Sequence, residues 1–345
     1  MGVVIIKRCS SSSSGDFGLY IDGSLEYLET PQDIVRIAPY KFYEKTSLKS
    51  VKITNNVQEI GGFAFYNCTM VTDWDICNCL TTVGNYAFSG SGGEMFLDFN
   101  SGTNTFTRVD SGGFDNCLIR SIRGNLINIG PSAFSYNTDR SISVDVKING
   151  SIGGGAFRNS MFTSFHLDKN SVITSIGNES FGFCRNNTGS EMVFDFRASS
   201  FSTIPEQAFV GNPNPDSTLK FVSFYFPNSL LSINGNQVFY YHFNCNYYFL
   251  SSTPCTILRN TFNYVYNSNI FVPYNSINAY KTATNWLYYD AYIKGWAPEN
   301  TFSAGDPLPV VNQEGITLTW YTDRECTNQI SVVSNPGVEL YCVGS

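Results

Sequence analysis

One short phrase recurs along this chain of 345 residues and limits the folds that are open to it. Each copy has an aliphatic residue, usually a Gly next, two or three variable residues, a small residue and then Phe. Three of the ten copies are Ile60–Phe65 (IGGFAF), Val83–Phe88 (VGNYAF) and Ile129–Phe134 (IGPSAF). A phrase that returns about every 20 to 50 residues indicates a repeat protein whose successive units stack on one another.

The Phe that closes each copy defines the period of the repeat. Neighbouring Phe residues are 20 to 30 positions apart, and the commonest spacing is 23. A unit of this length cannot bury its own apolar side, so the copies should stack with Phe over Phe in one continuous core. We therefore predict a structural ladder of ten buried rings: Phe42, Phe65, Phe88, Phe114, Phe134, Phe157, Phe181, Phe209, Phe239 and Phe262.

A second pattern lies between the anchor phrases, where two apolar residues flank a polar one. This alternation is typical of a strand with one side facing inward and the middle residue facing out. The six examples are Val51–Ile53, Trp74–Ile76, Leu97–Phe99, Val146–Ile148, Phe165–Leu167 and Phe194–Phe196. Their middle residues are predicted to form one outward row: Lys52, Asp75, Asp98, Lys147, His166 and Asp195.

Small residues within the anchor phrase make two local predictions. The Gly after the aliphatic residue predicts a turn that needs a positive φ, which Gly adopts easily. The Ala or Ser before Phe predicts close packing against the neighbouring coil. One or two helical turns are expected around these Ala-Phe phrases.

The whole unit resembles the BspA-like leucine-rich repeats, and Leu48–Cys68 (LKSVKITNNVQEIGGFAFYNC) fits that pattern almost throughout. The Cys three residues after Phe recurs at Cys117 and Cys184, and the resemblance covers about residues 31–272. It implies a right-handed leucine-rich-repeat solenoid of about ten coils, mainly β with short helical turns. It also implies that these thiols are buried and not in disulfides.

The segment after the last repeat is similar to the helical cap that closes such arrays. A cap is needed because the last coil would otherwise expose its Phe. The sequence predicts a helix from Tyr280 to Ile293 that buries Tyr280, Ala283, Leu287 and Tyr288. Residues 299–345 resemble a small bacterial surface β module, with strands expected at 315–323 and 338–342. We thus expect an N-terminal cap or tether (1–30), a solenoid with its cap (31–298) and the β module (299–345).

Charge and hydropathy exclude two classes of partner. The net charge is −7 and no basic run occurs, which argues against nucleic acid because phosphate binding needs clustered Lys and Arg. No apolar run approaches the roughly 18 residues of a membrane-spanning helix, so no membrane insertion is expected. The first residues do not match the order of a secretory signal, because the basic pair follows the short apolar stretch.

Cysteine and histidine give little support for metal or catalytic chemistry. Cys77 and Cys79 form a C-x-C that we interpret as small core residues, because no second Cys/His pair lies near to complete a zinc site. Cys326 and Cys342 could pair within the last segment, and the sequence leaves this open. Of the two histidines, His166 is expected on the surface and His242 packed among aromatic side chains.

The enzyme hypothesis fails on motifs and spacing. No recognisable nucleophile, metalloprotease or P-loop motif is present. Asp98 and Asp195 are several coils apart at about 4.8 Å per coil, so they cannot share one substrate bond. Asp75 and Asp98 are the one pair that could approach each other. We predict no catalysis, no cofactor and no metal.

The extended face of the array is the expected functional surface. It combines the outward row with aromatic candidates Tyr225, Tyr240 and Tyr241, and aromatic side chains give large contact areas at interfaces. The first hypothesis is an adhesion scaffold, extracellular or on a cell surface, that binds a host or bacterial surface protein or a glycan. The alternative is a structural part of a larger assembly, such as a phage virion appendage. The sequence leaves the oligomeric state open.

Overall fold

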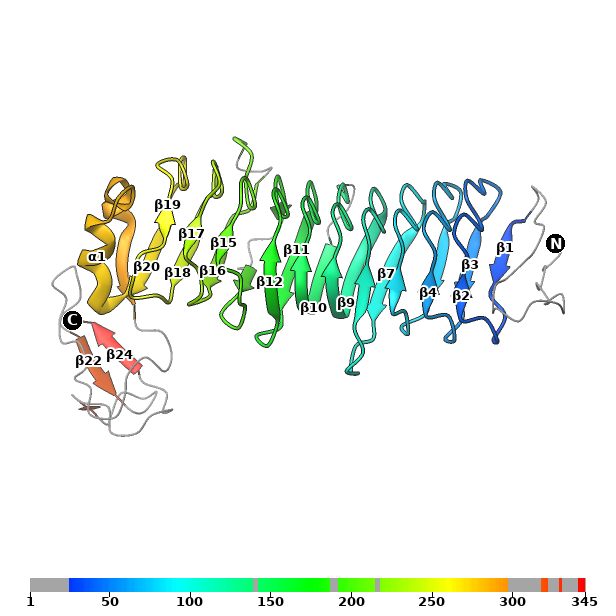
Figure 1. Ribbon diagram of the computed structural model, residues 1–345, viewed down its shortest axis with the longest axis horizontal. Coiled ribbons are helices and arrows are strands. Elements are labelled where there is room, and N and C mark those ends of the chain that lie inside the picture. Colours follow the sequence, from blue (N-terminus) through cyan, green and yellow to red (C-terminus); the bar gives the residue numbers. More distant parts are fainter. Residues whose placement is uncertain are drawn as a thin grey trace.

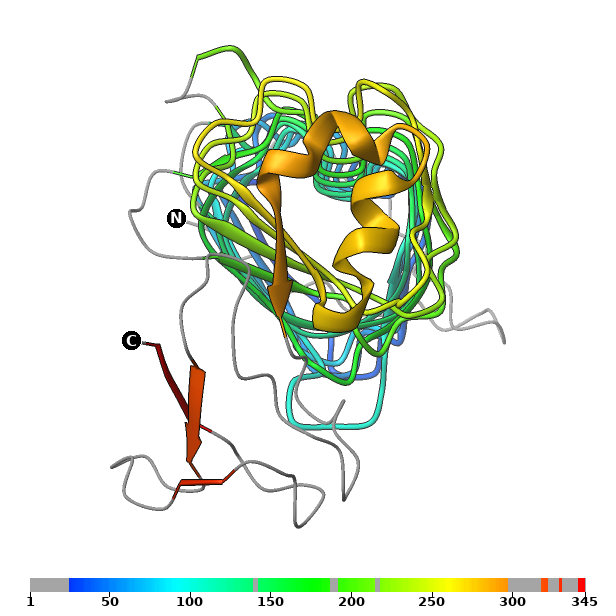
Figure 2. The ribbon, with the colours of Figure 1, turned by 90° about the vertical axis from the view of Figure 1, so that its left-hand side faces the viewer.

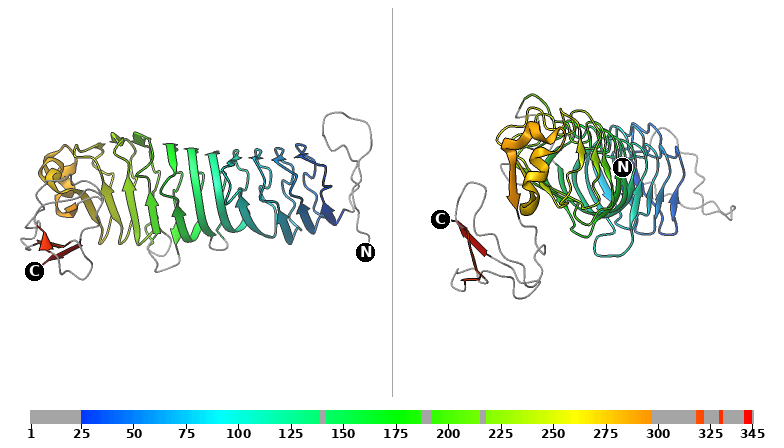
Figure 3. Two further views of the ribbon diagram at one scale, coloured as in Figure 1. Left: turned by 90° about the horizontal axis from the view of Figure 1, so that it is seen from below. Right: turned by 60° about the vertical axis from the view of Figure 1, so that its left-hand side comes forward.

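The computed structural model describes residues 25–138, 142–186, 192–214 and 218–296, and three further strands within 318–344. The chain forms a parallel β-solenoid of about 11 turns, so the predicted fold class is confirmed (Figure 1). Successive coils lie side by side along one long axis, and their strands run in the same direction (Figure 3). Each coil has three sides, which are a main strand, a short second strand and an arch of turns.

The main strands form one side of the solenoid, and each pairs in parallel with the next. They are β1 (Tyr27–Glu29), β3 (Ser50–Ile53), β5 (Asp73–Ile76), β7 (Glu94–Phe99), β9 (Leu118–Ile129), β10 (Ile142–Ile152), β11 (Met161–Leu167), β14 (Met192–Asp195), β16 (Val222–Phe226), β18 (Asn246–Phe249), β20 (Asn269–Pro273) and β21 (Ile293–Trp296). The short β13 (Arg185–Asn186) pairs with the start of β11. Because β1 already pairs with β3, stacking begins a few residues before position 31.

The second strands form the adjoining side, and each ends on the aliphatic residue of an anchor phrase. They are β2 (Arg36–Ile37), β4 (Glu59–Ile60), β6 (Thr82–Val83), β8 (Thr107–Val109), β12 (Val172–Ile176), β15 (Thr203–Ile204), β17 (Ser232–Ile233) and β19 (Thr256–Ile257). Strands β9 and β10 are long enough to run through both sides. They therefore join the two sides into one 18-stranded sheet, while β15, β17 and β19 form a separate three-stranded sheet.

The ten anchor Phe rings lie in the interior, each at most 1% exposed. Each ring stacks on the next, with centroids 4.9–5.7 Å apart and planes within 16° of parallel. The distance between rings follows from the roughly 4.8 Å separation of paired strands. Sequence spacings of up to 30 residues leave this stack intact, because the extra residues lie between the repeated positions of a coil.

The arch that carries each Phe differs from the prediction. Around Phe65 the positive φ values fall two residues before and two after it, at Phe63 (φ 58°) and Asn67 (φ 53°), not at Gly61. Alternate amides donate to the next coil, as in Phe63 N to Asn85 O (2.8 Å) and Phe65 N to Ala87 O (2.7 Å). The arch is therefore a run of hydrogen-bonded turns locked to its neighbour, and the helical turns expected at the Ala-Phe phrases are absent from the described coils.

The Gly of the anchor phrase has a steric role instead. A Cβ on Gly61 would lie 2.4 Å from the Pro39 nitrogen, and a Cβ on Gly177 would lie 2.4 Å from the Gly154 nitrogen. Neither residue has a positive φ. Gly is needed here because the backbones of neighbouring coils approach closely at this corner.

The C-terminal end is closed by a short helical cap, which Figure 2 shows lying across the last coil. It consists of η2 (Tyr274–Ser276), α1 (Ile277–Thr282) and η3 (Trp286–Tyr292), and β21 follows it. Tyr280, Trp286 and Tyr289 are buried against the core.

One part of the cap prediction is wrong, because Leu287 and Tyr288 are each 50% exposed. The α-helix ends early: Ala283 is extended and Asn285 is left-handed with φ 66°. This break rotates the following turn, so Trp286 and Tyr289 occupy the positions that a continuous helix would have given to Leu287 and Tyr288.

Three strands near the C-terminus form a small antiparallel sheet in the order β23-β22-β24. They are β22 (Leu318–Tyr321), β23 (Gln329–Ile330) and β24 (Tyr341–Gly344); β22 and β24 overlap the two stretches expected to be strands, whereas β23 was not expected. Cys326 lies outside the described residues, and the side chain of Cys342 in β24 is not described either, so the possible Cys326–Cys342 bond stays a prediction. Within the described residues, no helix is long and apolar enough to span a membrane.

Candidate interaction surface

The outward face of the main sheet carries most of the predicted binding residues, but not in one row. Strand pairing aligns Glu29 with Lys52 and Lys52 with Asp75. Strand β5 pairs with β7 through Asp73 and Glu94, so Asp75 and Asp98 are out of register by two positions. The structure therefore brings together Lys52 and Asp75 but separates Asp75 from Asp98.

A second row starts at Asp98, which aligns with Arg123, then Asp145, then His166. Lys147, which was predicted for this row, lies two positions further along β10 and aligns with Asn125. Its ammonium group lies 5.8 Å from the centre of the Phe106 ring. The prediction chose the wrong residue of β10, because several polar residues of that long strand, Asp145 and Lys147 among them, face outward.

The exposed charges on this face are largely compensated by neighbouring coils. Lys52 Nζ lies 2.9 Å from Glu29 Oε1, and His166 Nδ1 lies 2.6 Å from Asp145 Oδ1. The hydrogen bond that Lys52 donates to Glu29 raises the pKa of Lys52, and the negative charge of Glu29 adds to this effect. Such pairs tie neighbouring coils together, and the face carries charges of both signs.

Asp195 is not the exposed carboxylate that the sequence predicted, because it is only 8% exposed. The Arg197 guanidinium covers it with a forked contact, Nε at 3.0 Å from Oδ1 and Nη2 at 2.7 Å from Oδ2. The same guanidinium lies 5.0 Å from the centre of the Tyr225 ring, and Tyr225 aligns with Asp195 on the next strand. Asp195 thus holds Arg197 in place over an aromatic side chain.

Tyr225 begins an outer aromatic row, which we define as Tyr225, Tyr248 and Phe271. Their ring centroids are 4.4 and 4.6 Å apart and the planes are within 8° of parallel. Trp296 lies edge-on to Tyr225 and to Tyr248. The Arg197 guanidinium covers one face of Tyr225, and the stacked rings cover one another's faces. The row therefore presents mainly ring edges and hydroxyl groups to a partner.

The other two aromatic candidates lie on a different side of the coil. Tyr240 and Tyr241 follow the anchor Phe239, so they belong to the arch. Tyr241 stacks on Tyr264 at 5.1 Å, and Tyr240 contacts both rings edge-on. They do not join Tyr225 in one site.

His242 lies in the core, fully buried, as the packing interpretation predicted. Its Nε2–H donates to the Phe209 carbonyl at 2.7 Å, which leaves Nδ1 to accept from the Tyr247 hydroxyl at 2.9 Å. Burial lowers the pKa of His242 to about 4, although the Phe209 carbonyl acts in the opposite direction. The neutral ring is a packing element with both nitrogens satisfied.

The Cys77 and Cys79 thiols lie close together, with 3.3 Å between the sulfur atoms. Both donate to the Val57 carbonyl of the preceding coil. Burial raises the pKa of Cys77 to about 12. Among the described residues, no group of three or more His, Cys, Asp or Glu side chains could hold a metal ion.

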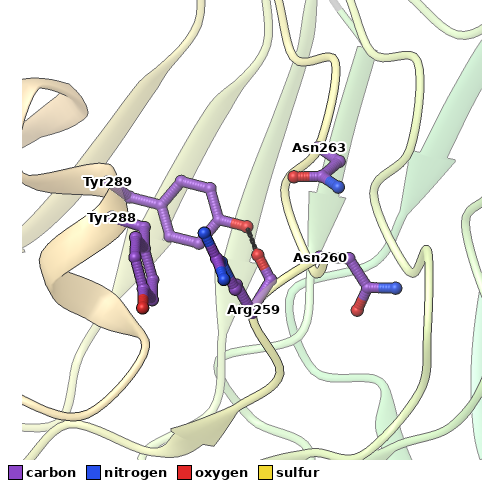
Figure 4. A pocket seen from close by; sticks show the side chains of 5 residues that line it. All are labelled: Arg259, Asn260, Asn263, Tyr288 and Tyr289. Carbon is purple, nitrogen blue, oxygen red and sulfur yellow. Dashed lines mark hydrogen bonds between the residues drawn. The ribbon is translucent and has the colours of Figure 1, made fainter.

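A cavity of about 400 Å³ lies beside the C-terminal cap, and no sequence pattern indicated it. It is lined by Arg259, Asn260 and Asn263 from the last repeat and by Tyr288 and Tyr289 from η3 (Figure 4). The Arg259 guanidinium lies 4.4 Å from the centre of the Tyr288 ring. Tyr289 donates its hydroxyl to the Arg259 carbonyl at 2.5 Å.

Comparison with known proteins gives a family match and similar solved structures, among them two bacterial leucine-rich repeat proteins. The family described as BspA type leucine-rich repeat region matches six copies over residues 13–141 and 97–188, together just over half of the chain. A leucine-rich repeat protein from Bacteroides ovatus ATCC 8483 is 17% identical, with a TM-score of 0.40, covering 79% of this chain and 82% of that one. A leucine-rich cell surface protein from Faecalibacterium prausnitzii A2-165 is 18% identical, with a TM-score of 0.28, covering 71% and 79%. No curated protein matches.

Proposed function

This chain belongs to the BspA-type leucine-rich repeat family, and from that premise we propose that it is a non-catalytic scaffold that binds a surface protein through the outward face of its main sheet. The observation that carries the proposal is the continuity of that face. About 11 coils at roughly 4.8 Å each give a surface about 50 Å long. Repeat arrays use such extended surfaces for recognition.

The chemistry of the face favours a protein over a glycan as the partner. Sugars stack on free aromatic faces, whereas the faces between Tyr225, Tyr248 and Phe271 are occupied by one another. The compensated charges suit a partner that also carries charges of both signs. Exposed Phe96 and Arg123, on neighbouring strands of this face, are residue types common at protein interfaces.

Family membership also supports a location on the cell surface or outside the cell. A surface scaffold in this position would meet proteins of a host or of neighbouring bacteria. Neither the described residues nor the comparisons favour the alternative of a virion appendage. The absence of catalysis is part of the proposal, and mass spectrometry of the panel members after incubation with the chain tests it by detecting any turnover.

The experiment is a binding screen followed by mapping. The purified chain is tested by biolayer interferometry against panels of host surface proteins, bacterial surface proteins and glycans. Any protein that binds is then measured with the double variant Phe96→Ala/Arg123→Ala. The matched control is Leu231→Ala/Lys169→Ala, which removes one exposed apolar and one exposed cationic side chain from other parts of the coil.

We expect the first variant to weaken binding at least tenfold and the control to leave it unchanged. Loss in the control alone would place the partner on another side and overturn the proposal. A panel in which glycans bind and proteins do not would overturn the partner class. Turnover of a panel member would overturn the non-catalytic assignment.

A further inference from the structure

We propose that the cavity beside the cap binds a sugar acid, meaning a saccharide with a carboxylate group, with Arg259 as the residue that holds the carboxylate. The cavity lies between the last repeat and η3, away from the outward face of the main sheet. This inference therefore goes beyond the proposed function, and either one can fail without the other.

Arg259 brings to the cavity a positive charge that no described carboxylate neutralises. Five of the arginines in the described ranges form an ion pair with an acidic side chain, for example Arg120 with Glu94 and Arg158 with Glu179. No described carboxylate pairs with Arg259, which instead lies flat against Tyr288. A planar guanidinium fixed in this way can donate two parallel hydrogen bonds to a carboxylate.

Two carboxamides, those of Asn260 and Asn263, line the cavity beside the Arg259 charge. Asn260 donates to Asn236 through Nδ2 at 3.1 Å, and its Oδ1 remains able to accept. Asn263 is exposed at the same wall, and each carboxamide offers both donors and acceptors. Adjacent hydroxyls of a sugar need this combination, whereas a purely apolar ligand would leave these groups unpaired.

The two walls of the cavity, η3 and the last repeat, are held together by hydrogen bonds in the absence of a ligand. Asn285 Nδ2 donates to the Ile257 carbonyl at 2.7 Å, and Trp286 Nε1 donates to the Cys255 carbonyl at 2.7 Å. Together with the Tyr289 bond to Arg259, these contacts hold η3 against the last repeat. A preformed site loses less entropy when it binds a ligand.

Size and charge narrow the ligand class. A volume of about 400 Å³ lies in the range of about 300–1,000 Å³ typical of small-molecule sites, and one sugar residue fits within it. A phosphate carries more charge than one guanidinium balances in a chain of net charge −7. A singly charged carboxylate matches the site better.

The full chain is titrated with glucuronate and with galacturonate, and binding is measured by isothermal titration calorimetry or ligand-observed NMR. Glucose and galactose are the matched sugars without a carboxylate. Inorganic phosphate and glutamate test whether the site binds other anions instead. Arg259→Gln removes the charge, Arg259→Lys keeps the charge without the fork, and Asn263→Ala removes one carboxamide. Arg36→Gln, at an exposed arginine of an early coil, is the control, and circular dichroism checks that every variant folds.

We expect the uronates to bind at least tenfold more tightly than the neutral sugars. Arg259→Gln should abolish that preference, Arg259→Lys should retain part of it, and Arg36→Gln should retain all of it. Equal binding of acidic and neutral sugars would overturn the proposal, as would binding unchanged in Arg259→Gln. Preference for phosphate or glutamate, or no binding of any probe, would also overturn it.

Discussion

Gly61 lies so close to Pro39 of the preceding coil that a Cβ on Gly61 would be 2.4 Å from the Pro39 nitrogen. The Gly61 amide also donates to the Ile37 carbonyl at 2.8 Å, which holds the two coils at this distance. The same close approach recurs at Gly84, Gly130, Gly153 and Gly177. The anchor Gly is therefore a requirement of coil-to-coil packing and not of backbone conformation.

Gly61→Ala should lower the free energy of unfolding by roughly 1–3 kcal/mol, as forced overpacking does. The control is Gly62→Ala, whose Cβ would have its nearest contact at 3.2 Å, with the Asn85 carbonyl oxygen. Both glycines lack a positive φ, so the two substitutions should change the conformational freedom of the backbone to a similar extent. Urea unfolding followed by circular dichroism compares them, and equal losses would contradict the steric account.

Phe134→Ala should lower the free energy of unfolding by about 3–5 kcal/mol, as a large core deletion does. Its ring is fully buried between Phe114 and Phe157 in the ladder. Lys169→Ala, at an exposed site, should change stability by less than about 0.5 kcal/mol. Hydrogen exchange should show the added opening in the coils next to Phe134, and uniform loosening of the whole array would count against nearest-neighbour stacking.

The period of the sequence was sufficient to predict the ladder and the strands, but not the rows on the outward face. An alternating pattern says which side of a strand a residue faces, and nothing about its neighbour on the next strand. Strand β5 pairs with β7 through Asp73 and Glu94, which puts Asp98 two positions beyond the residue opposite Asp75. Such shifts depend on bulges and loop lengths that carry no local sequence signal.

The cavity was missed for a related reason. Predicting one helix from Tyr280 to Ile293 placed Tyr288 in the core, where it could not line a site. The break between Ala283 and Asn285 contains neither Gly nor Pro, the usual helix breakers. Asn285, a residue type that tolerates the left-handed conformation, was the only sequence signal of the break.

Trp286→Ala should destabilise the cap by about 3–5 kcal/mol, because its indole is 1% exposed and packs edge-on against Phe249. Leu287→Ala, one residue later and half exposed, should cost less than about 1 kcal/mol. Thermal unfolding compares the two. A larger effect of Leu287→Ala than of Trp286→Ala would support the continuous helix that the sequence predicted and contradict the observed break.

Cys79 should be the first of the described cysteines to react with a disulfide reagent such as Ellman's reagent under native conditions. The other six are buried, and burial raises the pKa of the thiols at Cys68, Cys117 and Cys184, among others, to about 12. Thiolate, not thiol, is the reactive form. Mass spectrometry after brief labelling identifies the site, and Cys79→Ser is the control; rapid labelling of Cys117 or Cys184 would contradict the buried assignment.

Stability should depend on pH through His242. Burial lowers its pKa to about 4 in the folded chain, while an unfolded His has a pKa of about 6.5. Below pH 6.5 the unfolded chain takes up a proton that the folded chain excludes, so unfolding becomes more favourable as the pH falls. The contribution is fully present above pH 6.5, and about 3 kcal/mol of it is lost by pH 4.

A matched pair of variants separates His242 from the carboxylates that titrate in the same range. His242→Gln removes the buried titration and retains a donor for the Phe209 carbonyl, whereas His166→Gln removes an exposed imidazole. Free energies of unfolding at pH 7 and pH 4 are measured for both variants and for the unmodified chain. The unmodified chain and His166→Gln should lose about 3 kcal/mol more than His242→Gln over this interval. Parallel losses in all three would mean that the imidazole of His242 accepts its proton without leaving the core.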